Sequence, residues 1–265
     1  ISCRRQRQMC IRDRLILIKK KLLLIQYLVF LIKMRVVILT CYPEMFPGSL
    51  GYSVIGNALN NKKFSLEIVN LHNFGIDKRG SVDDEPFGGG PGMVIRPDVI
   101  EKALNSITFK TDNYCKIFLT PSGQKLSQAK LNNLSKYDEM LILCGRFEGV
   151  DQRAIEILDF QEISIGDYVL SGGEIAAQVL VEGCIRLIPG VLGQPQSLLE
   201  ESFSNNLLEY PHYTRPQTWE DIQGNKHEVP DVLTSGHHEK IDKWRKEKSV
   251  EKTKELRPDL YKKEI

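Results

Sequence analysis

Runs of strand length alternate along the chain with segments of helical character. The runs lie at residues 35–40, 65–71, 116–119, 140–144 and 159–163, and those at 35–40 and 140–144 are almost entirely apolar. Helices are predicted between them, at 51–60, 97–105, 127–134 and 175–188. Because strands and helices alternate, the sequence predicts an α/β fold with a mainly parallel sheet covered on both faces.

Three of these strands are followed by loops rich in glycine or proline, at residues 120–123, 145–151 and 164–174. Ligands of α/β sheets collect beside the carboxyl ends of strands, and glycine lets a backbone approach a ligand closely. A ligand site is therefore expected at these loops. The alternative for 164–174 is a tight connection capped by Ser171.

The first strand continues into residues 41–46, CYPEMF, without the Gly-x-Gly-x-x-Gly turn of a Rossmann fold, which disfavours that fold.

A long polar loop occupies residues 77–93 and ends in the run GGGPGM. It is too rich in glycine for a strand or helix and too long for a simple connection. Either it is a flexible loop near a substrate or it is a solvated surface loop. A phosphate-binding P-loop is excluded because no Lys-Ser/Thr pair follows the glycines.

The amino-acid composition of the chain changes after residue 188. A Pro/Gly/polar linker leads to a smaller helical region, for which Ser235 is a candidate N-cap and Ile241 and Trp244 share one face. Five basic residues lie on this helix, and they either form a solvated face or contact an RNA backbone: Lys240, Lys243, Arg245, Lys246 and Lys248.

The composition of the 265-residue chain, 42% hydrophobic and 26% charged, is that of a soluble globular protein. Residues 1–33 are basic and patternless, and we expect the fold to begin at Met34. The apolar run 22–32 is too short for a membrane span and lacks a signal-peptide cleavage site. The chain has 36 basic and 34 acidic residues. Nine of the basic residues and one of the acidic residues lie in 1–33, so the remainder of the chain has 27 basic and 33 acidic residues. Any RNA contact must come from a local patch.

Six cysteines show no Cys-x-x-Cys pairing, so no metal site is expected. Two of them lie in residues 1–33. The other four, in apolar contexts, are predicted to be buried thiols of a reducing compartment: Cys41, Cys115, Cys144 and Cys184.

Four motifs occur in order, at residues 144–153 (CGRFEGVDQR), 164–174 (SIGDYVLSGGE), 188–193 (IPGVLG) and 211–216 (PHYTRP). From Met34 onward the chain closely resembles the bacterial tRNA (guanine-37-N1)-methyltransferases, knotted enzymes of the SPOUT class that use S-adenosylmethionine. The resemblance implies a C-terminal trefoil knot in the sheet domain and a small α-helical C-terminal domain. It implies a methyltransferase domain at 34–192, a flexible linker at 193–208 that carries the base, and a tRNA-binding domain at 209–265.

Methylation of guanine N1 requires a base for the N1 proton and a group that holds charge at O6. Glu201 stands before Ser202-Phe203, where the resembling family has its catalytic aspartate, and neighbouring Glu200 stays an alternative. Arg186 matches the family's essential arginine, although an arginine there could also simply complement the helix dipole. In the family the 77–93 loop helps form the guanine pocket, which makes Asp83 a candidate substrate contact.

The resemblance also implies which residues bind the methyl donor, with Glu148 and Asp167 as candidates to face its cationic end. Phe147 replaces a usual tyrosine and Ala176 a proline, which bears on affinity rather than on reacting groups. The predicted donor-binding residues are Leu119, Thr120, Pro121, Gly145, Phe147, Glu148, Gly149, Ile165, Gly166, Asp167, Tyr168, Val169, Leu170, Gly172 and Gly173.

The family builds each active site from two subunits, so the resemblance implies a cytoplasmic homodimer acting on tRNA, with no DNA or membrane partner. The alternatives are a SPOUT RNA methyltransferase with another target base and a non-catalytic RNA-binding relative that kept the donor pocket. Glu201 and Arg186 discriminate between them, because a pure binder needs neither. A phosphate-handling enzyme is disfavoured by the missing P-loop lysine.

Overall fold

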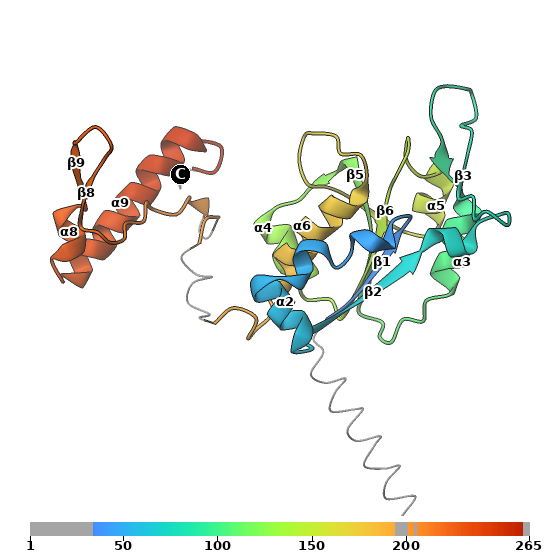
Figure 1. The fold of residues 1–265 in the computed structure, drawn as a ribbon, viewed down its shortest axis with the longest axis horizontal. Coiled ribbons are helices and arrows are strands. Elements are labelled where there is room, and N and C mark those ends of the chain that lie inside the picture. Colours follow the sequence, from blue (N-terminus) through green and yellow to red (C-terminus); the bar gives the residue numbers. More distant parts are fainter. Residues whose placement is uncertain (1–33, 194–200, 204–205, 262–265) are drawn as a thin grey trace, which may run out of the picture. The chain divides into compact units, whose positions relative to one another are not determined.

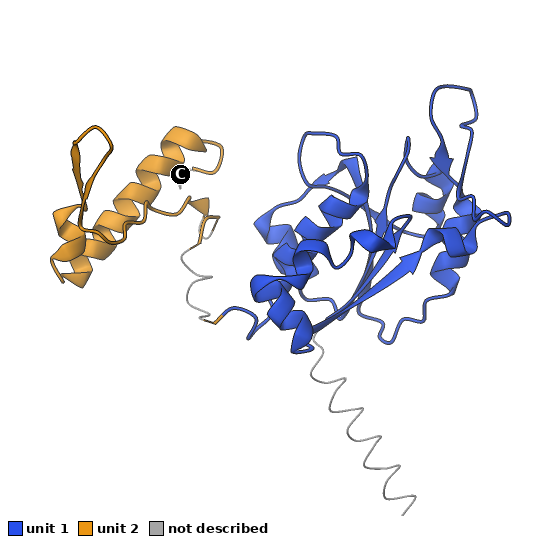
Figure 2. Cartoon of the chain, viewed as in Figure 1, with its two compact units in different colours: residues 1–192 blue, residues 193–265 orange. Residues whose placement is uncertain are grey.

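A computed structural model describes residues 34–193, 201–203 and 206–261 of the chain (Figure 1). The chain divides into two compact units, one ending at Leu192 and the other beginning at Gly193 (Figure 2). The predicted extension 1–33 and most of the predicted linker 193–208 lie outside the described residues. The division of the second unit into a linker and a tRNA-binding domain stays a prediction.

The first unit is built on a parallel sheet of five strands in the order β2-β1-β6-β5-β7. This confirms the predicted α/β fold with a mainly parallel sheet. The strands are β1 (Met34–Thr40), β2 (Phe64–Asn70), β5 (Tyr114–Lys125), β6 (Glu139–Cys144) and β7 (Gln161–Ser164).

Helices cover both faces of this sheet (Figure 1). One face packs against α2 (Ser53–Asn60), α4 (Gln128–Leu134) and α6 (Gly173–Ile185). The other packs against α3 (Pro97–Asn105) and α5 (Gln152–Ile157). Three short 3-10 helices, η1 (Pro43–Met45), η2 (Gly48–Gly51) and η3 (Leu71–Phe74), complete the connections.

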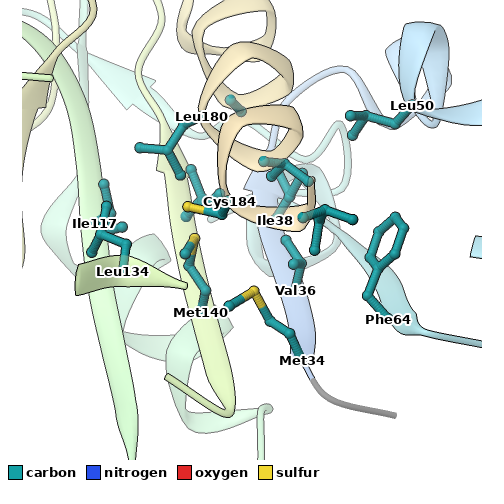
Figure 3. Packing of buried hydrophobic residues seen from close by; sticks show 14 of the residues in the cluster. Met34, Val36, Ile38, Leu50, Phe64, Ile117, Leu134, Met140, Leu180 and Cys184 are labelled. Atoms are coloured by element: carbon teal, nitrogen blue, oxygen red, sulfur yellow. The ribbon is translucent and has the colours of Figure 1, made fainter. Parts of the chain in front are cut away.

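Successive side chains of β1 point to opposite faces of the sheet, as the two-residue period of a strand requires. Val36 and Ile38 join the cluster beneath α6, beside Leu180 and Cys184 (Figure 3). Val37 and Leu39 join the cluster on the other face. A strand buried on both faces is apolar at nearly every position, which is why β1 and β6 were recognisable from sequence.

The predicted end of a strand at Leu119 was wrong, because β5 runs on to Lys125. Its pairing with β7 shifts register between Leu119 and Gln124, so that both residues face Ile163. A Cβ at Gly123 would lie 2.4 Å from the backbone nitrogen of Ile163. A glycine at this irregularity thus lets the two strands approach each other and resume pairing.

The loop at 77–93 was predicted to contain no strand, but Asp83–Asp84 forms β3. It pairs antiparallel with β4 (Val94–Ile95). An ion pair stabilises this pair of strands, since the Arg96 guanidinium lies 2.8 Å from a carboxylate oxygen of Asp84. Two residues are too short a segment to show alternation in a sequence.

The second unit contains the hairpin β8 (Thr218–Glu220) and β9 (Lys226–Glu228), followed by α8 (Asp231–Thr234) and α9 (His238–Leu256). The N-cap of α9 is His237, so the expectation of Ser235 was wrong. The Ser235 hydroxyl instead donates to the Val232 carbonyl at the end of α8. Ile241 and Trp244 are both half-buried. Buried Thr253 accepts a hydrogen bond from the Leu208 amide, which fastens that segment to α9.

The four cysteines after residue 33 are free and buried, as predicted. Burial raises the pKa of Cys41, Cys115 and Cys184 to about 12, so these thiols are protonated and unreactive at neutral pH. Within the described residues, no helix combines the length and the apolar character needed to cross a bilayer.

Candidate active site

A cavity of about 250 Å³ opens beside the carboxyl ends of β6 and β7 and the part of β5 around Leu119. Three segments form its wall: the continuation of β5 after Leu119, the turn after β6 and the loop between β7 and α6. The described residues that line it are Phe118, Leu119, Thr120, Pro121, Gly145, Arg146, Phe147, Glu148, Gly149, Ile163, Ser164, Ile165, Gly166, Tyr168, Val169, Leu170, Ser171, Gly172, Gly173 and Ala176.

The structure brings the predicted donor-binding residues together around this cavity, with the exception of Asp167. The Asp167 side chain is 86% exposed, and its carboxylate lies 3.0 Å from the Lys125 ammonium group. Glu148 lines the cavity, so it is the better placed of the two predicted carboxylates. The role of these residues in donor binding stays a prediction.

Gly173 holds the loop before α6 against the turn after β6. Its amide donates to the Gly145 carbonyl at 2.9 Å, and a Cβ there would lie 2.8 Å from the Cys144 Cα. The N-cap of α6 is Gly172, with no side-chain cap, so the alternative of a cap by Ser171 is wrong. Gly173 is needed here because the loop rests directly on the backbone of Cys144 and Gly145, whereas a Cβ at Gly172 would lie 2.3 Å from the Nε of the Arg146 side chain.

We expect Gly173→Ala to lower the free energy of unfolding by about 1–3 kcal/mol, because its methyl group would meet backbone atoms of Cys144 and Gly145. Urea denaturation followed by circular dichroism measures the change. The matched control is Gly193→Ala, where an added Cβ meets no atom within 4 Å. Equal stability of the two variants would contradict the close packing described here.

An ion pair buried behind the cavity wall joins the turn after β6 to α6. The Arg146 Nε lies 3.0 Å from Oε2 of Glu174, whose side chain is fully buried. Neither atom completes an aligned hydrogen bond, so the contact is a close-range ion pair. The other oxygen, Oε1, accepts a hydrogen bond from the Thr40 hydroxyl at 2.8 Å. Three elements distant in sequence are thereby linked: β1, the turn after β6 and α6.

Arg146 is fixed by further contacts as well. Its guanidinium lies 4.3 Å from the centroid of the Tyr42 ring and donates to the Ser171 carbonyl at 3.1 Å. Arg146 and Glu174 both lie within sequence motifs, but no role was predicted for either residue. Charged residues are usually solvated, and nothing in their spacing of 28 positions shows that they pair.

The end of the 77–93 loop adjoins the cavity wall at Glu148. The Glu148 amide donates to the Met93 carbonyl at 2.9 Å, and a Cβ at Gly92 would lie 2.4 Å from the Glu148 Cγ. This contact favours the interpretation of the loop as one near a ligand site. Asp83 itself is half-buried in β3 and is not among the described residues lining the cavity.

The two predicted catalytic residues belong to different units. Arg186 is the C-cap of α6 and half-buried, and its amide donates to the Glu182 carbonyl. Glu201 is half-buried in the second unit. Their catalytic roles stay predictions. Within the part of the chain that is described, no group of three or more His, Cys, Asp or Glu side chains is placed to hold a metal ion.

Comparison with known proteins gives consistent matches. The family model described as tRNA (Guanine-1)-methyltransferase TrmD matches residues 34–263. A protein of Ehrlichia canis named tRNA (guanine-N(1)-)-methyltransferase is 50% identical over 228 residues, which are 86% of this chain and 95% of that protein. Proteins of the same name from Wolbachia pipientis and Rhodospirillum rubrum are 52% and 51% identical, over 85% and 86% of this chain and 96% and 92% of their own.

Proposed function

The chain belongs to the tRNA (guanine-1)-methyltransferase family, and from this premise we propose that it transfers a methyl group from S-adenosylmethionine to N1 of guanosine 37 of tRNA, next to the anticodon. The observation that carries the proposal is the cavity beside β5 and the carboxyl ends of β6 and β7. Three segments converge there, and two of them bear the family's motifs 144–153 and 164–174.

The residues around the cavity fit such a donor. Gly145, Gly172 and Gly173 bring backbone to the wall at places where a Cβ would collide with neighbouring atoms. Glu148 supplies one carboxylate for the donor's cationic end. When bound, S-adenosylmethionine supplies a methyl group activated by a positively charged sulfur. The chain's own part is to hold that group close to the nucleophile and in line with it.

Two side chains are proposed to act on the guanine. The Glu201 carboxylate takes the proton of N1, which frees a lone pair for attack on the methyl carbon. The Arg186 guanidinium stabilises the negative charge that moves to O6. Glutamate in place of the family's aspartate adds one methylene between the backbone and the base. Asp83 is proposed to contact the substrate guanine.

We propose that the enzyme is a homodimer with active sites shared between subunits. On α6, Ile175 and Val179 lie one turn apart and are 49% and 47% exposed, as expected of side chains that a second subunit covers. We also propose the family's trefoil knot in the C-terminal part of the sheet unit.

The second unit is proposed to be a small helical domain that binds tRNA. Lys240, Lys243 and Lys246 on α9 are exposed and available to phosphates. The enzyme is proposed to work in the cytoplasm, where its substrate is found.

Incubation of the protein with unmodified tRNA and S-adenosylmethionine should produce 1-methylguanosine, detected by mass spectrometry of the digested nucleosides. A tRNA with adenosine at position 37 is the matched control and should stay unmethylated. Methylation of another base would favour the alternative of a SPOUT enzyme with a different target. Tight tRNA binding without any methylated nucleoside would favour a non-catalytic relative.

A further inference from the structure

The wall of the cavity contains a positive charge that is unfavourable for the proposed donor. Among the described lining residues, Arg146 is the only cation and Glu148 the only carboxylate. An arginine keeps its charge at any physiological pH. Left uncompensated, this guanidinium would offset Glu148 and repel a ligand that itself carries a positively charged sulfur.

We propose that Glu174 is a positioning and charge-neutralising residue, which cancels the charge of Arg146 so that the cavity prefers the cationic donor over its neutral-sulfur product. This inference rests on the proposed function, since it concerns the donor of that reaction. Glu174 acts through Arg146 and is not among the described residues that line the cavity.

The geometry suits this role. A buried carboxylate is costly unless it is paired, and Glu174 has a cation 3.0 Å from one oxygen and the Thr40 hydroxyl 2.8 Å from the other. It also lies in the first turn of α6, where the helix dipole favours a negative charge. The charge is therefore held in place.

Arg146 is equally restrained. The Tyr42 ring and the Ser171 carbonyl hold its guanidinium, so it cannot turn away from the wall into water to escape a ligand's charge. Burial raises the pKa of the neighbouring Cys144 thiol; Glu174 raises it further, whereas Arg146 lowers it. The two charges thus oppose each other at the residue just before Gly145 of the cavity wall.

Two ligands isolate the effect, because S-adenosylmethionine and S-adenosylhomocysteine differ only in the methyl group and the charge on sulfur. The ratio of their dissociation constants, measured by calorimetry, is the readout. In Glu174→Gln the preference for S-adenosylmethionine should fall about three- to tenfold relative to the natural protein. Glutamine has nearly the same shape and can still accept the Thr40 hydrogen bond. A role in packing alone would weaken both ligands by the same factor and leave the ratio unchanged.

Two further variants separate charge from structure. Thr40→Val removes the hydrogen bond but keeps both charges, so the ratio should not change even if both ligands bind more weakly. In Arg146→Met/Glu174→Gln both charges are gone, and the ratio should return to that of the natural protein. A ratio that falls in Thr40→Val, or stays low in the double variant, would overturn the proposal.

Arg146→Met alone keeps the proposal testable if Glu174→Gln does not fold. Arg146→Met leaves the Glu174 carboxylate uncancelled behind the cavity wall, so the preference for S-adenosylmethionine should rise above that of the natural protein. An unchanged or lower ratio would show that the Arg146 charge does not act on the ligand and would overturn the inference. If the natural protein bound neither ligand, the proposed function would fail. If it bound both and Glu174→Gln kept the natural ratio, only the charge-neutralising role would fail.

Discussion

Replacement of Glu201 by glutamine should slow methylation of guanosine 37 about 10²–10⁴-fold, with the affinities for S-adenosylmethionine and tRNA little changed. Glutamine keeps the size of the side chain and its capacity for hydrogen bonds, but it cannot accept the N1 proton. Single-turnover methylation of a tRNA with guanosine after the anticodon measures the chemical step apart from product release. The loss should therefore appear in the rate of methyl transfer.

Two matched variants define which carboxylate is the base. Glu201→Asp restores the residue of the resembling family and should retain substantial activity. Glu200→Gln alters the neighbouring residue, which lies outside the described part of the chain, and should be nearly as active as the natural protein. A fully active Glu201→Gln protein would refute the assignment, and an inactive Glu200→Gln protein would move it by one residue.

Arg186→Ala should slow the same single-turnover reaction by about 10²–10³-fold, as expected when one donor to a developing oxyanion is removed. Arg186→Lys should recover only part of the rate, because an ammonium group lacks the planar fork of a guanidinium. Arg186 also ends α6, so a purely structural role is the competing explanation. In that case Arg186→Ala would lower the melting temperature and leave the rate of the folded fraction intact.

The same two variants test the shared active site. Glu201→Gln and Arg186→Ala chains, mixed and allowed to exchange subunits, should recover about a quarter of the natural activity, because half of the dimers would be mixed and each would hold one intact site. Two inactive variants that stay inactive after exchange would indicate that each subunit carries a complete site.

The elements predicted most accurately are those whose burial is uniform. Met34–Thr40 and Glu139–Cys144 are central parallel strands with apolar side chains on both faces, and their sequences show it directly. β8–β9 could not be found in this way, because all six of its residues are exposed and no apolar alternation remains. The continuation of β5 past Pro121 also gave no signal, since it depends on a register shift against β7.

For the candidate site, local motifs identified the loops and the structure explains their convergence. Gly145, Gly172 and Gly173 stand out in sequence because only glycine permits such close approach. The pairing of Arg146 with Glu174 depends instead on the tertiary fold, which brings a turn and a helix start together. Asp167 shows the converse, because a conspicuous position in a motif did not bring its side chain to the cavity.

The strand order has a consequence for how the protein is made. β1 is synthesised well before β6, with which it pairs, and Arg35 of β1 contacts Glu139, 104 residues later in the chain. Until that segment leaves the ribosome, one edge of β1 has no partner and the apolar side chains beneath the sheet lack their cover. Nascent chains that stop short of β6 therefore cannot complete the sheet and present an unpaired edge to other chains or to chaperones.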